Sequence, residues 1–436
     1  MVLSWVIAFL DRQIIGILIE PLRRDLALSD TQISLIQGGA FAFFFVFAGL
    51  PIGRLVDRTN RRTILFAGML LWSGMTIACG CADRFWELFL ARIGVGVGEA
   101  CLAPASMSII ADVIPPPRRG LAMGLMIGAT AVGSAVSVLL GGLVLQAYGA
   151  RAAYVVPLIG ALTSWQMVFF LVGIPGLILS LLLLTIAEPA RRERAPSGSK
   201  PSFTAYLNRY RSAFAFTYAA FVANAVFGYV VSAWIAVILL RIDKMAPGRL
   251  GISMALILLI CGPIGPTFSG MLGDRLARTR PESGRLLITQ IIYPIQMVLT
   301  GLWWWFPGAD ASLAFFALSS PLLSAMISAS CYPALGQLAP NELRGQAIAV
   351  FALIANLAGL GIGPTAVALI TDYGFHDPAR VKESVILVAL PVAGIGLLSA
   401  TLARRPFRSA VSGAAGSAGA SLSRSGRTNR MELAAH

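Results

Sequence analysis

The sequence GRLVDRTNRR, at residues 53–62, decides the fold because it returns in a related form as GMLGDRLARTR at residues 270–280. Each copy follows directly on a long apolar run. A second pair of related segments, PPPRRGLA at 115–122 and PNELRGQA at 340–347, opens two further apolar runs. Both pairs are separated by about half of the 436-residue chain. Two motif pairs at nearly the same offset predict that the chain consists of two related halves.

The composition is that of a protein embedded in a membrane. The chain is 57% hydrophobic and only 12% charged, with a mean hydropathy of +0.78, whereas a soluble protein carries about 25% charged residues. A helix of about 20 apolar residues crosses the ~30 Å hydrocarbon core of a bilayer. Twelve such runs are present, at residues 1–20, 31–53, 64–82, 85–111, 120–147, 164–187, 213–240, 251–272, 285–306, 311–337, 345–370 and 383–404.

The sequence therefore predicts an all-α membrane protein with twelve transmembrane helices in two pseudo-symmetric six-helix bundles. Residues 1–187 form the N-terminal bundle and residues 213–404 form the C-terminal bundle. A polar cytoplasmic linker, residues 188–212, joins the two bundles. The tail, residues 405–436, is small, polar and basic, and we expect it to be a disordered cytoplasmic segment.

The formal net charge of +14 comes from basic residues that gather in the loops on one side of the expected helices, whereas the loops on the opposite side are short or balanced in charge. This distribution follows the positive-inside rule. It predicts a multi-pass protein of the cell (inner) membrane, surrounded by the lipid bilayer, with both termini in the cytoplasm. Because the basic residues form no single face or stripe, nucleic acid is not expected as a partner.

Two ionised residues, Asp11 and Arg12, stand in the middle of the first apolar run. A charge at this depth costs roughly 2.5–3.5 kcal/mol on insertion scales and usually marks a path for ions or substrate. Glu99, on the fourth run, reaches a similar depth near the midplane, and Arg92 lies two turns from it on the same face. Charged groups in a site of low dielectric constant suit a proton relay.

In this hypothesis Asp11 and Glu99 carry the coupling proton with Arg92 as their partner, and Arg12 exchanges between them and an anionic substrate headgroup. Glu99→Gln should then abolish transport driven by a pH gradient while preserving folding. The alternative is a static salt bridge that fixes the first helix to the fourth.

The second half has no matching buried charge and offers neutral polar and aromatic side chains instead. We expect these side chains to contact the substrate together with Arg12: Asn224, Tyr229, Trp234, Ser328, Tyr332 and Asn356. A cavity that is charged on one side and apolar on the other fits an amphipathic substrate, with its headgroup toward the first half and its tail toward the second.

The repeated loop motif is expected to close the cytoplasmic side. Gly53 permits close helix packing, and Asp57 is placed to lie near the positive N-terminus of a helix in the other half. Arg61 or Arg62 is expected to pair with Asp112 at the cytoplasmic end of the fourth helix. The complete set expected at this gate is Gly53, Asp57, Arg58, Arg61, Arg62, Asp112, Asp274 and Arg275, the last two acting in the second half. The alternative is an ordinary positive-inside loop.

These motifs resemble those of a known family. GRLVDRTNRR resembles the signature loop of the major facilitator superfamily, and RIGVGVGEA at 92–100 resembles a second motif of that superfamily. The combination of DRQ at 11–13, DRTNRR at 57–62 and ARIGVGVGEACLAPAS at 91–106 is similar to the spinster-like branch. The two-times-six architecture extends the resemblance over the whole chain.

The resemblance implies alternating access around a midplane site, a lysolipid or sphingoid phosphate as substrate, coupling to protons as in the bacterial members, and a monomer. The sequence departs from the family pattern in one respect, because only ten residues precede Asp11. Either the chain begins at a late start codon or it lacks the first turns of the first helix.

The sequence argues against an enzyme. Its five cysteines all lie in apolar runs, where we expect them to pack rather than to bind metal. With only two histidines and no nucleophile–base set, neither a metal nor an organic cofactor is expected, and the proton gradient is the driving force. The sequence thus predicts a proton-coupled secondary transporter of an amphipathic, lysolipid-like substrate. The alternatives are a broad-specificity drug or small-molecule proton antiporter and, in a different class, a membrane sensor that does not transport.

Overall fold

The computed structural model describes residues 1–149, 154–156, 160–190, 202–279 and 284–433. Within these residues, twelve helical segments are long and apolar enough to cross a membrane, which confirms the number predicted from the sequence. They span Val2–Asp25, Asp30–Arg58, Arg61–Gly80, Phe85–Val113, Pro117–Tyr148, Ser164–Leu183, Arg211–Arg241, Pro247–Leu276, Arg285–Trp305, Ala309–Leu338, Leu343–Phe375 and Pro378–Ser412.

The N-terminal half is built from helices and one short hairpin. Its elements are α1 (Val2–Asp25), α2 (Asp30–Ser34), the π-helical turn η1 (Leu35–Gly39), α3 (Ala40–Arg58), α4 (Arg61–Gly80), α5 (Phe85–Glu99), α6 (Leu102–Val113), α7 (Pro116–Tyr148), β1 (Tyr154–Val156), β2 (Gly160–Leu162) and α8 (Ser164–Leu183). The strands β1 and β2 pair antiparallel between α7 and α8. The side chain of Asn60 accepts a hydrogen bond from the backbone N–H of Thr63 and so caps the start of α4.

The C-terminal half follows a short helix, α9 (Phe203–Arg209), that lies within the predicted linker. Its elements are α10 (Arg211–Arg241), α11 (Pro247–Thr279), α12 (Gly284–Trp305), α13 (Ala309–Ala317), η2 (Leu318–Ser324), α14 (Ala325–Leu338), α15 (Asn341–Asn356), η3 (Leu357–Ile362), α16 (Gly363–Leu369), η4 (Ile370–Phe375), η5 (Pro378–Arg380) and α17 (Val381–Leu433). Three of these short elements, η2, η3 and η4, are π-helical turns inside longer spans.

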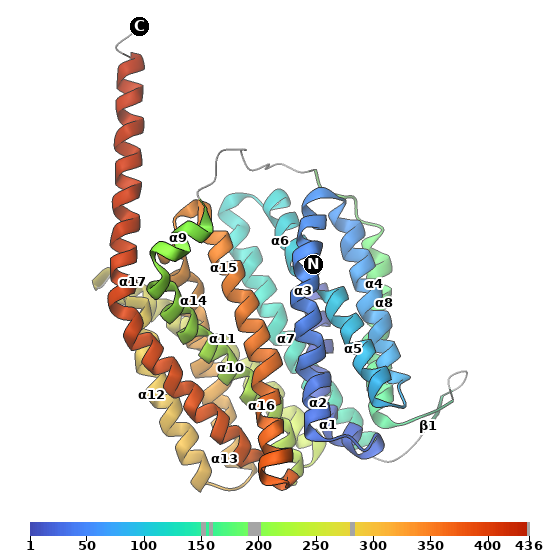
Figure 1. The fold of residues 1–436 in the computed structure, drawn as a ribbon. Coiled ribbons are helices and arrows are strands. Elements are labelled where there is room, and N and C mark those ends of the chain that lie inside the picture. Colours follow the sequence, from blue (N-terminus) through green and yellow to red (C-terminus); the bar gives the residue numbers. More distant parts are fainter. Residues whose placement is uncertain (150–153, 157–159, 191–201, 280–283, 434–436) are drawn as a thin grey trace.

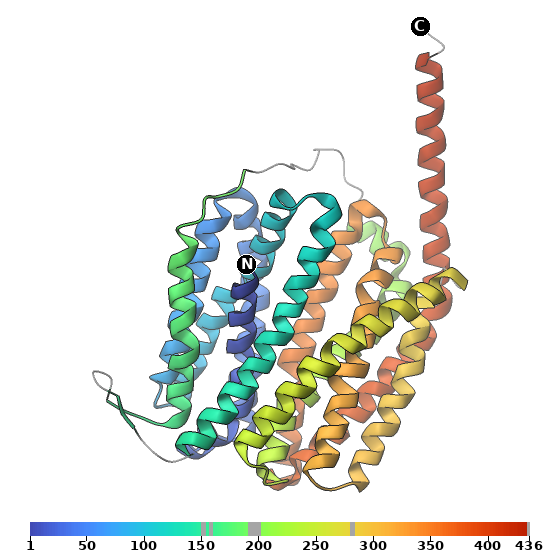
Figure 2. The same cartoon turned by 180° about the vertical axis from the view of Figure 1, so that it is seen from behind.

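The two bundles lie side by side, as Figures 1 and 2 show. The halves meet along two long contacts, α7 against α11 and α1 against α10. At the first contact a Cβ added at Gly142 would lie 2.8 Å from the Cα of Gly251, so the backbones of α7 and α11 touch. We call the end at which α8 ends and α9 begins the linker side, and the opposite end, which carries the β1–β2 hairpin, the hairpin side.

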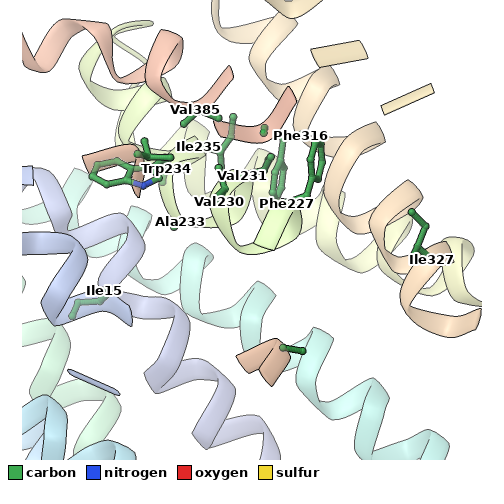
Figure 3. Close-up of a cluster of buried hydrophobic side chains, with 14 of the residues drawn as sticks. Ile15, Phe227, Val230, Val231, Ala233, Trp234, Ile235, Phe316, Ile327 and Val385 are labelled. Atoms are coloured by element: carbon green, nitrogen blue, oxygen red, sulfur yellow. The ribbon is translucent and has the colours of Figure 1, made fainter. Parts of the chain in front are cut away.

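The core is centred on α10 and extends across the boundary between the halves. Figure 3 shows Phe227 of α10 beside Phe316 of α13, with Val231 and Trp234 further along α10. The same apolar cluster includes Ile15 of α1, from the other half. The two bundles therefore share buried surface in this conformation, and their relative position is set by side-chain packing as well as by the linker.

The end of the chain differs from the prediction. The sequence predicts a last helix ending at residue 404 and a disordered tail from residue 405, whereas α17 continues as one helix to Leu433. Phe407 and Ala410 are fully buried against the bundle, so the packed domain extends at least to Ala410. Beyond it the helix projects away from the bundle (Figure 1). The segment after residue 404 is basic, which suggested disorder, but it also contains these two apolar residues. They lie three residues apart and so on one face of the helix.

Candidate functional site

The four charged residues predicted at membrane depth meet in the N-terminal half. Asp11 and Arg12 lie on α1, and Arg92 and Glu99 lie on α5. Nη2 of Arg12 lies 2.5 Å from Oε2 of Glu99, and Nη1 of Arg92 lies 3.3 Å from Oδ1 of Asp11. Each arginine thus pairs with the carboxylate of the other helix. The structure brings together all four residues that the sequence selected.

Three members of this charge cluster are sealed from solvent, and the fourth is not. Asp11, Arg92 and Glu99 are each at most 1% exposed, whereas the side chain of Arg12 is 14% exposed. A buried charge that loses its partner is strongly destabilising, by about 3–5 kcal/mol. Because Arg12 is the accessible member, it is the residue of the cluster that an incoming anion could contact first.

A hydroxyl that the sequence did not select completes the environment of Asp11. Oγ1 of Thr76, on α4, donates a hydrogen bond to Oδ2 of Asp11 and also lies 2.9 Å from the carbonyl oxygen of Trp72. One hydroxyl hydrogen serves only one of these acceptors at a time. Thr76 can therefore turn to the carbonyl oxygen when Asp11 no longer needs a donor. A single threonine in an apolar helix gives no sequence signal for this role.

The cluster also holds hydrogen-bonding groups without a partner among the described residues. They are Oε1 of Glu99, Nε and Nη2 of Arg92, and Nε of Arg12. Buried polar atoms are rarely left in this state in a native structure. A proton, a water molecule or the oxygens of a bound anion would each satisfy one of these groups.

Aromatic rings surround the accessible arginine. The guanidinium carbon of Arg12 lies 4.9 Å from the ring centroid of Phe9, 4.6 Å from that of Phe41 and 5.2 Å from that of Phe45. Cations within about 6 Å of a ring centroid are attracted to its face. The rings hold the charge in place and leave an apolar wall next to it, an environment that suits an anionic group attached to a hydrocarbon chain.

The residues predicted to contact substrate from the second half separate into two groups. Ser328 and Tyr332, on α14, are exposed, and Asn356 at the end of α15 is partly exposed. Tyr229, on α10, is partly buried and packs against the cluster that contains Phe41. Their contact with substrate stays a prediction.

Two members of the predicted set are structural in this conformation. Trp234 is fully buried, and its indole N–H donates to the carbonyl oxygen of Pro364 at 3.1 Å. Asn224 is 3% exposed, and its amide group donates to the carbonyl oxygen of Ser324 and to Oγ of Ser328, each at 3.0 Å. Both side chains thus hold core helices together in this conformation, and the contact of Trp234 and Asn224 with substrate stays a prediction.

The linker-side motif centres on Arg61. This fully buried side chain pairs with Asp112, as the sequence predicted. Its Nε donates to Oε1 of Glu188 at 2.8 Å, its Nη2 donates to the carbonyl oxygen of Pro189 at 2.7 Å, and its Nη1 donates to Oγ of Ser108 at 3.1 Å. Arg61 therefore fastens the first residues of the linker to the N-terminal half.

Glu188 is the member of this group that the sequence did not select. Its Oε2 accepts a hydrogen bond from the backbone N–H of Arg62 at 2.8 Å, while the side chain of Arg62 donates to the carbonyl oxygen of Ile186 at 3.0 Å. Partial burial opposes the charge of Glu188, but the hydrogen bonds from Arg61 and from the backbone of Arg62 hold the pKa of this carboxyl below its usual range.

The other N-terminal residues predicted at the gate do not form a buried group like the one around Arg61. A Cβ added at Gly53 would meet no atom within 4 Å, so the prediction of close helix packing at this glycine is wrong. Asp57 and Arg58 are exposed at the end of α3, which contacts α15 of the other half. Because no pairing of Asp57 with a helix N-terminus is described, that contact stays a prediction.

The second copy of the motif does not reproduce the arrangement around Arg61. Asp274 pairs with Arg285 at 3.4 Å, and the Asp274 side chain is 70% exposed. Arg275 is also exposed. Exposed ion pairs are worth little, with a median of about 0–1 kcal/mol, so the Asp274–Arg285 pair adds little here, and the gate role of Asp274 and Arg275 stays a prediction.

The hairpin side carries a network between the halves that the sequence did not predict. Arg241, at the end of α10, donates to Glu20 of α1 at 2.7 Å and to both oxygens of Asp30 of α2 at 2.7 and 2.8 Å. Nearby, the backbone N–H and the hydroxyl of Thr31 both donate to Oδ2 of Asp372, each at 2.7 Å. These bonds tie α1 and α2 to the C-terminal half, so the hairpin side is closed.

Twelve spans in two six-helix halves, with paired charges buried near the middle of one half, define a polytopic membrane transporter. The chain belongs to the Major Facilitator Superfamily, whose family model matches residues 1–364. This finding confirms the superfamily that the loop motif indicated.

Two relatives illustrate the range of the family around this chain. An MFS-type efflux pump of Mycolicibacterium smegmatis is 28% identical over 409 residues, which cover 92% of this chain and 90% of that protein. The sphingosine-1-phosphate transporter SPNS2 of Xenopus tropicalis is 30% identical over 169 residues, 38% of this chain and 33% of that protein.

Solved structures show the same fold. A bacterial homologue of the human lysosomal transporter Spinster, in an inward-facing and unoccupied conformation, superposes with a TM-score of 0.72 at 24% identity and covers 94% of this chain and 95% of that one. Its inward-facing, occupied form gives a TM-score of 0.70. Spinster-type proteins thus occur both among the sequence relatives and among the similar solved structures, as the resemblance of the sequence motifs implied.

Proposed function

We propose that this transporter is coupled to protons and moves an anionic, lysolipid-like amphiphile across the inner membrane by alternating access. The observation that carries the proposal is the pair of crossed ion pairs, Arg12 with Glu99 and Arg92 with Asp11. Both join α1 to α5, and the first contains the only member of the cluster with appreciable exposure.

The pairing suggests how substrate and proton are linked. When the acidic headgroup of a substrate contacts Arg12, the guanidinium turns from Glu99 toward the ligand. Glu99 then stands buried without a counter-charge, a state that costs several kcal/mol, and it takes up one proton from solution. Release of the substrate returns Arg12 to Glu99, and the proton leaves from the Glu99 carboxyl.

Asp11 belongs to the same relay. Arg92 and Thr76 both hold its carboxylate in the ionised form, through an ion pair and a donated hydrogen bond. If Arg92 turns its unused N–H groups toward Glu99 during the cycle, Asp11 loses its counter-charge and becomes the site for the proton. Asp11 and Glu99 would thus hold the proton in different stages of the cycle, with the two arginines deciding which one is neutral.

We take the linker side to be cytoplasmic, because arginines gather there at the end of α3 and at the starts of α4 and α7, as the positive-inside rule expects. On this orientation, the Arg241 network closes the outer face, and the group around Arg61 lies on the inner face. Rocking of the halves would then open each face in turn around the charge cluster.

The substrate class rests on two features. The aromatic wall around Arg12 pairs an anion-binding group with apolar surface, and the similarity to a sphingosine-1-phosphate transporter, although limited to 38% of this chain, suggests a lipid with an acidic headgroup. Exposed Tyr332 and Ser328 offer the second wall.

The second candidate is a broad-specificity drug–proton antiporter. It is favoured by the efflux pump of Mycolicibacterium smegmatis, which is similar over nearly the full length of both chains. In this case a cationic drug would bind to the ionised carboxylates of the cluster and displace a proton from them, so that drug and proton would compete rather than bind together. Buried, hydrogen-bonded carboxylates between helices argue against a sensor that has lost transport, since such charges are costly to keep.

Uptake into proteoliposomes separates these candidates. The protein is reconstituted, and uptake of a labelled lysophospholipid is compared with uptake of a small cationic drug, with and without a pH gradient. Gradient-stimulated lysophospholipid uptake supports the proposal, and preference for the drug supports the antiporter. No uptake of either compound favours the sensor.

The role of Glu99 is tested in the same vesicles. Glu99→Gln should abolish the stimulation by the gradient, whereas Glu87→Gln, an exposed glutamate on the same helix, should leave it unchanged. Unchanged gradient dependence in Glu99→Gln would contradict the proton relay.

A further inference from the structure

One aromatic ring is shared by both arginines of the charge cluster. Phe41, the second residue of α3, is fully buried. The guanidinium carbon of Arg12 lies 4.6 Å from its ring centroid, and that of Arg92 lies 5.6 Å from it. Both distances are within the range of a cation–π interaction. The other two rings near Arg12, Phe9 and Phe45, have no described contact of this kind with Arg92.

The backbone of Phe41 is packed tightly against the helix that carries two members of the cluster. A Cβ added at Gly96 would lie 2.8 Å from the carbonyl oxygen of Phe41, so only glycine fits at this point of α5. Gly96 stands between Arg92 and Glu99 in the sequence. Helices α3 and α5 therefore touch at the level of the cluster, and the position of Phe41 is tied to the segment of α5 that carries Arg92 and Glu99.

Phe41 also lies beside the contact between the two halves. The π-helical turn η1 ends two residues before it, and η1 packs against the π-helical turn η3 of the C-terminal half. A Cβ added at Gly38 would overlap the carbonyl oxygen of Leu360, and a Cβ added at Gly361 would lie 3.7 Å from the Cβ of Ala42. Leu360, Ala42 and Phe41 belong to one buried cluster.

The two facing turns are suited to movement. π-helical turns are rare and occur frequently at functional sites. At η1 and η3 the backbone of each half approaches the other without intervening side chains at Gly38. Because both η1 and α3 contact η3, rocking of the C-terminal half against the N-terminal half would act on η1 and on the start of α3.

We propose that Phe41 is a positioning residue that transmits the relative movement of the two halves to Arg12 and Arg92. This inference rests on the proposed function, in which these arginines decide which carboxylate is neutral. When η3 moves against η1, the ring moves from one guanidinium toward the other and changes the balance between the two ion pairs. This role requires the aromatic face of the ring, because an aliphatic side chain of similar size would fill the space without attracting either guanidinium.

The ionisable groups around this ring come from four elements. Asp11 and Arg12 lie on α1, and Arg92 and Glu99 lie on α5. Cys79 of α4 lies close enough to interact electrostatically with Asp11 and Arg92, and Tyr229 of α10 does so with Arg12. Four of these six groups form the charge cluster. A substitution at Phe41 should therefore change how the conformation of the protein responds when Glu99 is made neutral.

Distance measurement between spin labels tests this response without transport. Labels are placed at Thr185, at the end of α8, and at Gln346 of α15, both exposed on the linker side of different halves. Cys81 and Cys261, the two cysteines that are not buried, are replaced by serine. The distance distribution is recorded with and without Glu99→Gln in three backgrounds: wild type, Phe41→Leu and Phe41→Tyr.

We expect Glu99→Gln to shift the distribution in the wild type and in Phe41→Tyr, and we expect Phe41→Leu to lose this shift. Phe227→Leu, a fully buried phenylalanine of the other half, controls for a general loss of core packing and should keep the shift. The same shift in Phe41→Leu as in the wild type would overturn the inference. The absence of any shift in the wild type would also overturn it, because the cluster would then not be linked to the halves.

Transport supplies the second readout and keeps the two proposals apart. Uptake is measured with and without a pH gradient, and the ratio of the two rates is compared. This ratio should fall toward one in Phe41→Leu, and Phe41→Tyr should restore it. If the wild type itself shows no gradient dependence, the proposed proton coupling fails while the distance measurement still decides the role of Phe41.

Discussion

Arg241 and Glu20 belong to different halves of the protein, yet Nε of Arg241 lies 2.7 Å from Oε1 of Glu20. The same guanidinium reaches both oxygens of Asp30, a bidentate geometry that is among the strongest of side-chain hydrogen bonds. Asp30 is fully buried. This network can exist only when the ends of α1, α2 and α10 are together, so it belongs to the conformation in which the hairpin side is closed.

Arg241→Gln should therefore shift the protein toward a conformation that is open on the hairpin side. Removing one partner of a buried ion pair costs about 3–5 kcal/mol, and here the cost falls on the closed conformation alone. Spin labels at exposed Glu87 and Tyr373 should move apart. Arg249→Gln is the matched control, because the Arg249–Asp310 pair is exposed, at 64% and 87%. An unchanged distance in Arg241→Gln would show that packing alone closes this side.

The group around Arg61 predicts a pH dependence of stability. The pKa of Glu188 is lower in the folded protein than its usual range, because hydrogen bonds from Arg61 and Arg62 outweigh the effect of partial burial. A carboxyl of lowered pKa stabilises the fold above the pKa of the unfolded chain, and this contribution is lost as the pH falls through the folded-state pKa.

Glu188→Gln should thus lower the thermal stability of the detergent-solubilised protein at neutral pH, and the difference from the wild type should disappear as the medium is acidified below the usual range of glutamate. Asp310→Asn, at an exposed position, should show no such trend. A stability difference that persists unchanged into acid would mean that the charge of Glu188 contributes nothing.

Thr76 gives a third prediction, at the charge cluster. Thr76→Val keeps the shape of the side chain and removes the donor to Asp11. Hydrogen bonds to a charged group contribute about 1.5–3 kcal/mol, which corresponds to roughly a tenfold to hundredfold change in an equilibrium. We expect gradient-driven uptake in proteoliposomes to fall by about this factor in Thr76→Val and to be largely retained in Thr76→Ser. Equal uptake by both variants would contradict a role for the hydroxyl in proton transfer.

Much of the fold could be predicted from the sequence because a bilayer imposes simple rules. The length and polarity of a run decide whether it spans, and the repeated loop motif revealed the two halves. The charge cluster could be predicted for the same reason, since Asp11, Arg12, Arg92 and Glu99 are conspicuous at membrane depth. Their crossed pairing could not, because it depends on the rotation of α1 relative to α5.

The features that escaped prediction depend on contacts between segments far apart in the chain. Arg241 and Asp30 each lie in a short polar stretch that resembles an ordinary loop end, and 211 positions separate them. Thr76 is a lone hydroxyl in an apolar helix, and Glu188 lies at the boundary of the linker. Phe41 is one of 23 phenylalanines, so its two cation contacts could be recognised only once both arginines had been placed in space.

The division of the predicted substrate residues into core and exposed members yields the last prediction. Trp234→Phe removes the hydrogen bond to the carbonyl oxygen of Pro364 while keeping an aromatic ring in the core. Losing such a bond costs about 1–3 kcal/mol when the acceptor stays buried, so thermal stability should fall while the KM for the transported substrate stays at its wild-type value. Tyr332→Ala should do the opposite, because this side chain is 53% exposed on α14 and is predicted to contact the substrate. Trp305→Phe, on a residue that is 79% exposed, should change neither quantity. A raised KM in Trp234→Phe at unchanged stability would show that Trp234 contacts the substrate, in another conformation of the cycle that exposes it.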